Sequence, residues 1–188
     1  MKAPSVTYLA ETIEVDVAHW HELDRLSRDA DPDGQVALNR FLDRYGCVVR
    51  RARTRNLVTT AGKNDLGAKY FQGASYTAAW YVGLKGAGTP VVGDTMPSHA
   101  SWTEVTAYTQ STRPLLQLGA WSSGAANNSA NRAIFTANAA TTIHGYFLAN
   151  TSGKGGATGI LYSVANFSAS RSLTSGQAER VQVNLSFA

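Results

Sequence analysis

Few side chains in this chain of 188 residues are of the types that carry out acid–base chemistry. Beyond residue 65 the carboxylates are Asp94, Glu104 and Glu179, and residues 105–178 contain none. Glycoside hydrolysis needs two carboxylates that flank the scissile bond. Asp94 and Glu104 flank one loop, so they are the pair that such chemistry would use. Because the body of the chain offers so few acid or base groups, we predict that the protein is not an enzyme.

A metal-ligand pattern occurs once, in His19-Trp20-His21-Glu22 with Asp16 before it. Alternate histidines on a strand share a face and could bind zinc together with a carboxylate. A cupin-type site would need a further Glu and a distant His at fixed spacing, and the sequence does not supply them. We interpret the cluster as an exposed polar turn and predict no metal and no other cofactor.

The motifs of nucleophilic and phosphate chemistry are missing. No Gly-x-Ser-x-Gly turn for a hydrolase nucleophile occurs. The Gly-Lys-Gly at 153–155 lacks the first glycine and the following Ser or Thr of a phosphate-binding loop. His99 and His144 stand alone in the sequence, so we interpret both as structural residues. A single cysteine, Cys47, excludes an internal disulfide.

Charge is distributed unevenly along the chain. Residues 1–39 contain eight acids and three bases, whereas residues 40–74 contain eight bases and two acids. Clustered arginines can neutralise nucleic-acid phosphates, but no aromatic residues that would stack on bases are interleaved with them. We therefore predict no binding of nucleic acid. The cluster consists of Arg50, Arg51, Arg53 and Arg55.

On a strand, the last three of these arginines would line one face. They could pair with the acidic first part of the chain, either within the fold or across a subunit contact. No apolar run approaches the roughly 18 residues of a membrane span, and the N-terminus has no apolar segment of a secretory signal. We expect a protein that does not bind membranes and is made in the cytoplasm.

Short runs of β-type alternation, separated by clusters of Gly, Asn and Ser, dominate the chain. One short helix is expected at 61–71, ended by Gly73, with Leu66, Tyr70 and Phe71 on one face. Strands are also expected in 6–17, 36–42 and 47–53, and helix is the rival interpretation of 35–44. The main strands are expected at 77–84, 104–109, 115–120, 131–137, 141–149, 159–164 and 180–187.

Seven short strands at this spacing predict a mainly β protein, an antiparallel β-sandwich or jelly-roll-like domain with one short helix and an N-terminal extension. We assign residues 1–40 to the acidic extension, which could be an arm, a swapped strand or part of the core. Residues 41–188 form the sandwich domain. Gly83 and Gly86 are placed at a strand end and a turn. Aromatic and aliphatic residues suited to the core are Trp80, Tyr81, Leu84, Trp102 and Tyr108.

Several short motifs between residues 56 and 114 are informative when they are taken together. They are Asn-Leu-Val-Thr-Thr-Ala-Gly-Lys-Asn-Asp-Leu at 56–66, Lys-Tyr-Phe at 69–71, Ala-Trp-Tyr-Val-Gly-Leu-Lys-Gly at 79–86, Asp-Thr-Met at 94–96, Trp-Thr-Glu-Val-Thr-Ala-Tyr at 102–108 and Arg-Pro at 113–114. Gly-Tyr-Phe-Leu at 145–148, Lys-Gly-Gly at 154–156 and Gly-Ile-Leu-Tyr-Ser at 159–163 follow. Over residues 45–188 the chain resembles a family of small tailed-bacteriophage structural proteins that act as capsid decoration or cement proteins.

This resemblance implies a jelly-roll-like virion protein on the outer surface of a shell of major capsid protein, where it would act as a homodimer or homotrimer without catalytic residues. The strand with Arg50, Arg51, Arg53 and Arg55 would then contact complementary charge on the shell. The alternative is a head- or tail-fibre β module that binds glycans. Trp121 with Asn127 and Asn128 would supply the aromatic and amide groups for that task.

Overall fold

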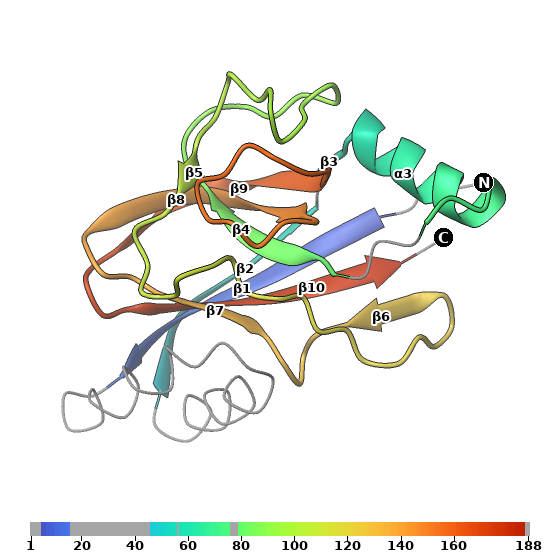
Figure 1. The fold of residues 1–188 in the computed structure, drawn as a ribbon. Coiled ribbons are helices and arrows are strands. Elements are labelled where there is room, and N and C mark those ends of the chain that lie inside the picture. The colour runs from blue at the N-terminus through green and yellow to red at the C-terminus, as the bar shows by residue number, and fades with distance from the viewer. Residues whose placement is uncertain (1–4, 16–45, 56, 76–78, 187–188) are drawn as a thin grey trace.

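The computed structural model of the chain describes residues 5–15, 46–55, 57–75 and 79–186. Two antiparallel β-sheets pack face to face, and the helix α3 (Thr60–Phe71) lies at one end of them (Figure 1). The prediction of a mainly β fold is therefore confirmed, and the described ranges contain one short helix as predicted, while the jelly-roll detail stays a prediction. Within the described ranges, no helix is both long and apolar enough to span a lipid bilayer.

The first sheet has the order β2-β1-β10-β6, with β7 also paired to β10. Its strands are β1 (Ser5–Val15), β2 (Gly46–Arg55), β6 (Ala125–Asn127), β7 (Ala133–Thr136) and β10 (Ala178–Ser186). The second sheet has the order β3-β9-β8-β4-β5. Its strands are β3 (Leu57–Val58), β4 (Tyr81–Lys85), β5 (Glu104–Val105), β8 (Thr141–Ala149) and β9 (Leu161–Leu173).

Part of the expected N-terminal extension belongs to the first sheet. β1 lies between β2 and β10 and pairs with both in antiparallel register. The strand expected at 6–17 is thus present, as is the one expected at 47–53. Residues 16–45, with the His19–Glu22 cluster and the expected strand at 36–42, lie outside the described residues, so the division into 1–40 and 41–188 stays a prediction.

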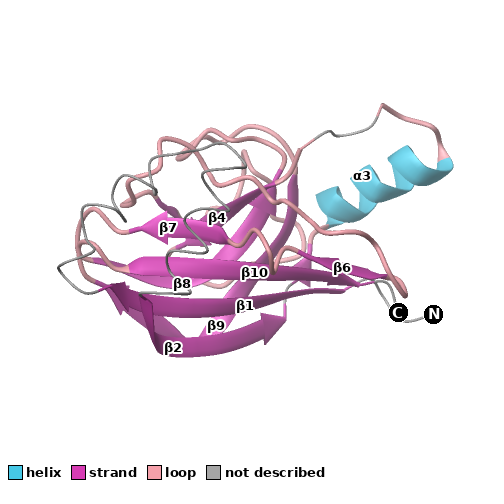
Figure 2. Cartoon of the chain, turned by 90° about the horizontal axis from the view of Figure 1, so that it is seen from below, coloured by secondary structure: helices cyan, strands magenta, loops and turns pink. Residues whose placement is uncertain are grey.

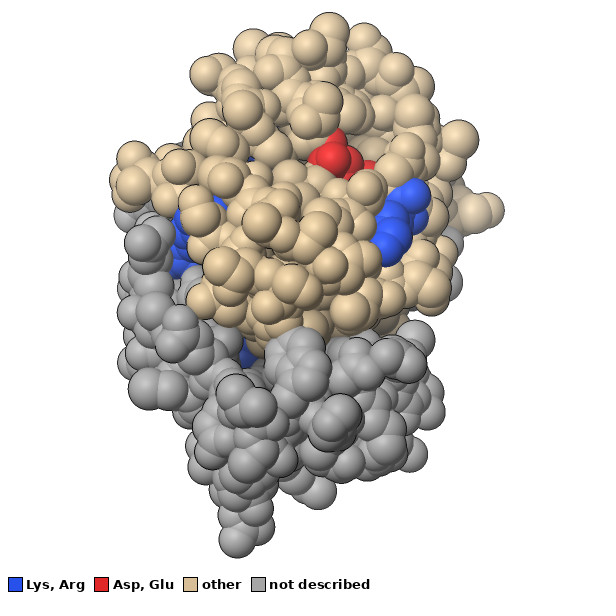
Figure 3. Space-filling view, turned by 90° about the vertical axis from the view of Figure 1, so that its left-hand side faces the viewer, with Lys and Arg blue, Asp and Glu red and all other residues tan. Residues whose placement is uncertain are grey.

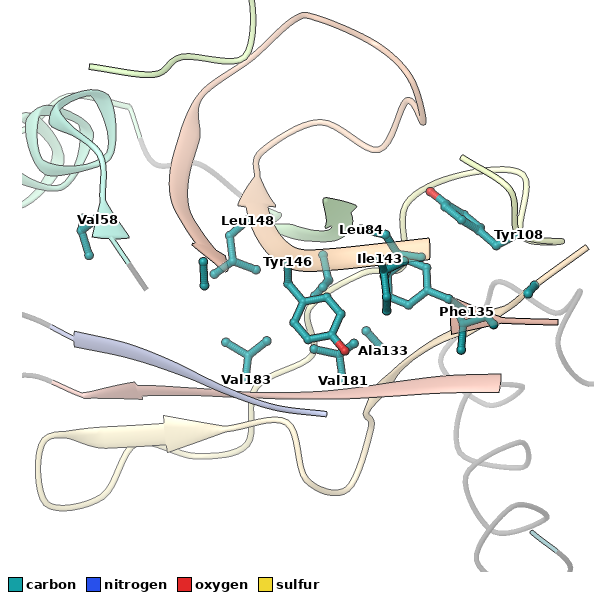
Figure 4. Close-up of a cluster of buried hydrophobic side chains, with 14 residues drawn as sticks. Val58, Leu84, Tyr108, Ala133, Phe135, Ile143, Tyr146, Leu148, Val181 and Val183 are labelled. Atoms are coloured by element: carbon teal, nitrogen blue, oxygen red, sulfur yellow. The ribbon is translucent and has the colours of Figure 1, made fainter. Parts of the chain in front are cut away.

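The main core lies between the two sheets (Figure 4). Alternate side chains of β10, among them Val181 and Val183, meet Leu84, Tyr146 and Leu148 from the opposite sheet. All five are at most 1% exposed. Alternation along these strands therefore directs one set of side chains into the sandwich and leaves the other set to face outward.

A second apolar cluster covers the outer face of the second sheet. Phe147 of β8 projects away from the main core and packs on Trp102, with 5.4 Å between ring centroids. Gly83 of β4 makes room for the Phe147 ring, because a Cβ there would lie 2.1 Å from the ring edge. The placement of Gly83 at a strand end is wrong, since it lies in the middle of β4.

Two of the aromatic residues expected in the core are not fully buried. Trp102, Tyr108 and Leu84 are at most 3% exposed, as expected. Trp80 and Tyr81 remain partly exposed. They lie where β4 begins, next to the loop that follows Pro114.

That loop is not the strand expected at 115–120. Leu115 makes an isolated bridge to Tyr81, and the Leu116 amide donates to the Trp80 carbonyl at 2.7 Å, but no ladder continues from there. Proline lacks an amide hydrogen, so Pro114 cannot donate to a ladder at its start. The chain instead runs irregularly along β4, and the short strand β6, which the sequence did not predict, follows it.

The helix α3 is held at its first turn. Thr59 caps it by accepting a hydrogen bond from the Gly62 amide at 3.0 Å. Gly62 lies directly on β9, because a Cβ there would be 2.4 Å from the Tyr162 carbonyl oxygen. Gly73 takes a positive φ of 69° just past the helix end, as the sequence predicted. Figure 2 shows that the remaining turns extend away from the sheets.

Candidate interaction surface

The four arginines singled out in the sequence lie on β2, at the edge of the first sheet as described. Arg51 is paired in register with Glu11 of β1. Arg53 and Arg55 follow at alternate positions, so these three positions share one face of the sheet. Arg50 belongs to the opposite face. Contact between this strand and a charged partner stays a prediction.

A groove runs between α3 and the loop at 115–121, and we call it the α3 groove. It has a volume of about 590 Å³. Leucines and aromatic rings from six separate parts of the chain line most of it. They include Leu66, Trp80, Leu115, Leu118, Trp121 and Tyr162.

Aromatic side chains are exposed at the rim of the α3 groove. Tyr70 is 79% exposed and Trp121 is 49% exposed. Deeper in the groove, Trp80 and Tyr162 pack edge to face at 5.3 Å. Isolated apolar side chains on a surface are ordinary, but a contiguous set of this kind is a candidate interaction site.

The charged groups in the α3 groove balance one another. Asp65 and Lys69, one helical turn apart on α3, form an ion pair. Both line the groove wall together with Tyr70. The groove thus carries no net charge of its own and suits an apolar occupant.

A buried ion pair fixes the point at which the groove loop begins. Arg113 donates to Glu104 through Nε at 2.9 Å and Nη2 at 2.7 Å. Its other N–H groups reach the Thr151 carbonyl and hydroxyl oxygens and the Gly156 carbonyl oxygen. All five guanidinium donors are used, and the side chain is fully buried. The next residue, Pro114, accepts from the Val82 amide at 2.9 Å, so the loop leaves a rigid base.

The carboxylates considered for acid–base chemistry each have their own structural partners. Asp94 accepts from the indole Nε1 of Trp102 at 2.9 Å. Glu104 holds Arg113, as described above. Glu179 lies in the main core, where it accepts from Arg171 at 2.6 Å. These contacts explain the three acids as parts of the fold, and the absence of enzymatic activity stays a prediction.

Burial shifts the pKa values of several groups in the described residues, among them Lys85 and Tyr146. Lys85, at the end of β4, donates from Nζ to the carbonyls of Gly86 at 2.8 Å and Gly88 at 2.6 Å. Burial lowers the pKa of Lys85 to about 8, and the nearby Asp94 charge partly opposes that shift. Burial also raises the pKa of Tyr146 well above its usual value, helped by the charge of Glu179.

Other candidate residues from the sequence fall into structural roles. The His99 ring stacks on Trp102 at 4.0 Å, and its Nδ1 lies 2.9 Å from the Trp102 carbonyl oxygen. Lys154 donates to the carbonyls of Tyr108 at 2.9 Å and Gln110 at 2.8 Å. Over the described ranges, no cluster of three or more His, Cys, Asp or Glu residues could hold a metal ion.

The residues proposed for glycan binding do not act together. Asn128 is 1% exposed, accepts from the Val183 amide and donates to the Val181 carbonyl, so it holds β10 and does not face solvent. Asn127 is exposed on β6. Trp121 instead belongs to the α3 groove. One signal in the sequence points to this surface, namely the three leucines at 115, 116 and 118 that come shortly before Trp121.

No protein-family model matches the chain, and a search of curated proteins found no match either. The inference of function therefore depends on the residues and geometry described above.

Proposed function

We propose that this chain is a virion structural protein that binds the outer surface of a major capsid protein shell and cements or decorates it without catalysis. Two kinds of evidence support the proposal. The motifs within residues 45–188 resemble those of phage decoration proteins. The α3 groove, with its exposed aromatic rim, is the observation that carries the binding role.

The chemistry of the α3 groove suits contact with another protein. Tryptophan and tyrosine are enriched among the residues that dominate binding energy, especially in pockets from which water is excluded. Trp121 and Tyr70 offer two such side chains beside a leucine-lined hollow. A segment of the shell that presents one or two apolar side chains would fill it.

Much of the remaining surface also tolerates burial against a neighbour. In Figure 3, the described surface at the end away from α3 is almost entirely uncharged. Charged residues are depleted at the centres of protein interfaces, because their desolvation is costly. A cement protein, which touches several shell subunits, benefits from such faces.

The loops around the groove are fixed before binding. Arg113 and Glu104 lock three chain segments together, and Thr59 caps the start of α3. A surface that is already ordered loses less conformational entropy when it binds. This order supports a binding module that works on a rigid shell.

The test is co-sedimentation of the purified chain with assembled, mature shells of its own phage, scored as copies per shell. We expect saturable binding at a copy number that matches a set of symmetry-related sites. Trp121→Ala should weaken binding by about 30-fold, the effect of losing roughly 2 kcal/mol at a dominant residue. Val92→Ser is the matched control, since Val92 is 47% exposed and lies outside the groove. Absence of binding to shells would refute the proposal.

The second candidate is a head- or tail-fibre module that binds glycans, and the exposed indole of Trp121 is the observation that favours it. The apolar faces of sugar rings stack on such side chains. This function predicts that the protein is present in virions, does not bind isolated shells and is retained on host polysaccharide. Retention should be lost in Trp121→Ala and kept in Val92→Ser.

A further inference from the structure

The flank of α3 that faces away from the α3 groove forms a second exposed surface, which we call the outer flank. Lys63, Gly67 and Phe71 follow one another along α3 at intervals of four residues. Asn64 and Ala68 lie beside them on the same flank. Residues at this spacing lie one above the other on a helix face. The flank borders an open hollow of about 470 Å³, and every described residue that lines it belongs to α3 or is its C-cap, Gln72.

Phe71 makes the outer flank apolar at its C-terminal end. Its side chain is 82% exposed, the highest value among the large apolar residues of the described chain. The ring of Tyr70 packs against it edge to face at 4.9 Å. Midway along the flank, a Cβ on Gly67 would meet nothing within 4 Å. The flank thus combines a protruding ring with a shallow, open centre.

The charge at the other end of the outer flank is unfavourable for an isolated helix. Lys63 is exposed in the first helical turn, where no acidic residue is present. The positive end of the helix dipole lies there, so a lysine is destabilising at that place. Among residues 57–75 and 79–186, the structure gives the Lys63 ammonium no hydrogen bond or ion pair. An external negative group would resolve this conflict.

We infer that the outer flank is the contact between two copies of this chain, packed as antiparallel α3 helices about a two-fold axis at Gly67. In that arrangement position 63 of one copy lies level with position 71 of the other. Each Lys63 then meets the negative, C-terminal end of the partner helix and the face of Phe71 in the partner copy. Cations are attracted both to helix C-termini and to aromatic faces. The two helix dipoles also oppose each other favourably.

This pairing is self-complementary, as a two-fold contact requires. One helix carries both the cation and the groups that attract it, at equal distances on either side of Gly67. Gly67 and Ala68 lie at the crossing, where small side chains allow the helix axes to approach to about 8 Å. The inference does not depend on capsid binding, because the α3 groove lies on the opposite flank and stays open in the pair.

Cysteine cross-linking tests the geometry directly. In a Cys47→Ser background, Gly67→Cys places two thiols at the proposed axis, and mild oxidation should produce a disulfide-linked dimer on non-reducing gels. Lys63→Cys is the matched control on the same flank. Its two copies would be offset along the helices by about 12 Å, from the rise of 1.5 Å per residue. A disulfide requires Cα atoms within about 7 Å, so this variant should stay monomeric on the gel. Equal cross-linking at both positions would overturn the inference.

Sedimentation equilibrium tests the contact without cross-links. The unmodified protein should be a dimer, and Phe71→Ser should raise its dissociation constant at least tenfold. Lys63→Glu should weaken the dimer and Lys63→Arg should preserve it, since only charge and reach matter there. Phe71 is so exposed that Phe71→Ser should keep the circular dichroism spectrum of the unmodified protein, which confirms folding. A monomer or trimer of the unmodified protein, or a dimer unaffected by Phe71→Ser, would refute the proposed pairing.

Discussion

Replacement of Arg113 by methionine should strongly destabilise the sandwich. The substitution keeps much of the volume of the side chain but removes five N–H donors, all of which have acceptors in the fold. It also leaves Glu104, whose side chain is 7% exposed, with the Gly155 amide as its remaining partner in the described structure. A buried carboxylate without its counter-charge is the costly product of this change.

The expected loss is about 3–5 kcal/mol, the usual effect of removing one partner from a buried ion pair. Single domains of ordinary stability have about 5–15 kcal/mol in total. With a urea m-value of about 2–3 kcal/mol/M for a chain of this size, the unfolding midpoint should fall by about 1–2.5 M. Urea titration followed by tryptophan fluorescence measures this, and equal m-values in the two proteins show that the change is one of stability.

Two further variants separate charge from geometry. Arg113→Lys keeps the charge but has three donors and no planar fork, so its midpoint should lie between those of the parent and of Arg113→Met. Combining Arg113→Met with Glu104→Leu removes both charges and should recover most of the lost stability. A shift below about 0.3 M for Arg113→Met, or a double variant less stable than the single one, would refute this account of the clamp.

Three other changes have defined outcomes. Gly83→Ala should cost about 1–3 kcal/mol by overpacking against the Phe147 ring, and Phe147→Leu in the same chain should restore part of the urea midpoint. Because the folded-state pKa of Lys85 is lowered from 10.5 to about 8, the unfolded chain holds more protons above pH 8, so stability should rise with pH from about 8 to 9.5. This dependence of stability on pH should vanish in Lys85→Met. It is measured as the thermal midpoint at a series of pH values below the range in which tyrosines ionise. Arg53→Glu combined with Arg55→Glu should weaken shell binding and reduce its dependence on salt, as co-sedimentation at two salt concentrations would show; unchanged binding would exclude β2 as a charged contact.

The sequence predicted those elements whose local signals agree with their packing. Strand β8 was predicted with the bounds that the structure shows, because alternation, β-branched residues and flanking turn residues all coincide there. The helix at 61–71 is predicted from the spacing of Leu66, Tyr70 and Phe71 and from Gly73 at its end. Leu66 and Tyr70 do share a flank, at the α3 groove, whereas Phe71 lies on the opposite one.

The errors came from long-range packing. Residues 115–120 look like a strand by composition, but a strand needs a partner, and the described neighbour β4 pairs with β5 and β8 instead. The sequence pattern predicts a strand end at Gly83, yet the reason for glycine there is the Phe147 ring, which comes from a strand more than 60 residues later in the chain. Single-sequence patterns carry no information on which distant side chain needs that space.

The candidate surface was harder to predict than the fold for the same reason. The sequence pattern predicts that Trp121 acts together with Asn127 and Asn128, and this grouping is wrong because Asn128 turns inward to hold β10. Its true neighbours in the α3 groove, Leu66 and Tyr162, come from segments that lie far away in sequence. The arginine cluster of β2 can be recognised from the sequence alone. The α3 groove, in contrast, forms only when distant segments come together in the tertiary fold.

The two flanks of α3 are best explained by functions other than stability. The helix contacts the sandwich mainly through its first turn, where Thr59 and Gly62 join it to β9. Its last turn buries almost none of Tyr70 or Phe71, so these rings contribute little to the free energy of unfolding. Exposed aromatic side chains promote nonspecific association, and a chain with so few surface charges has little charge repulsion to oppose that association. Two partners, one on each flank, would cover both rings and remove that liability, which is why the α3 groove and the outer flank are assigned to different contacts.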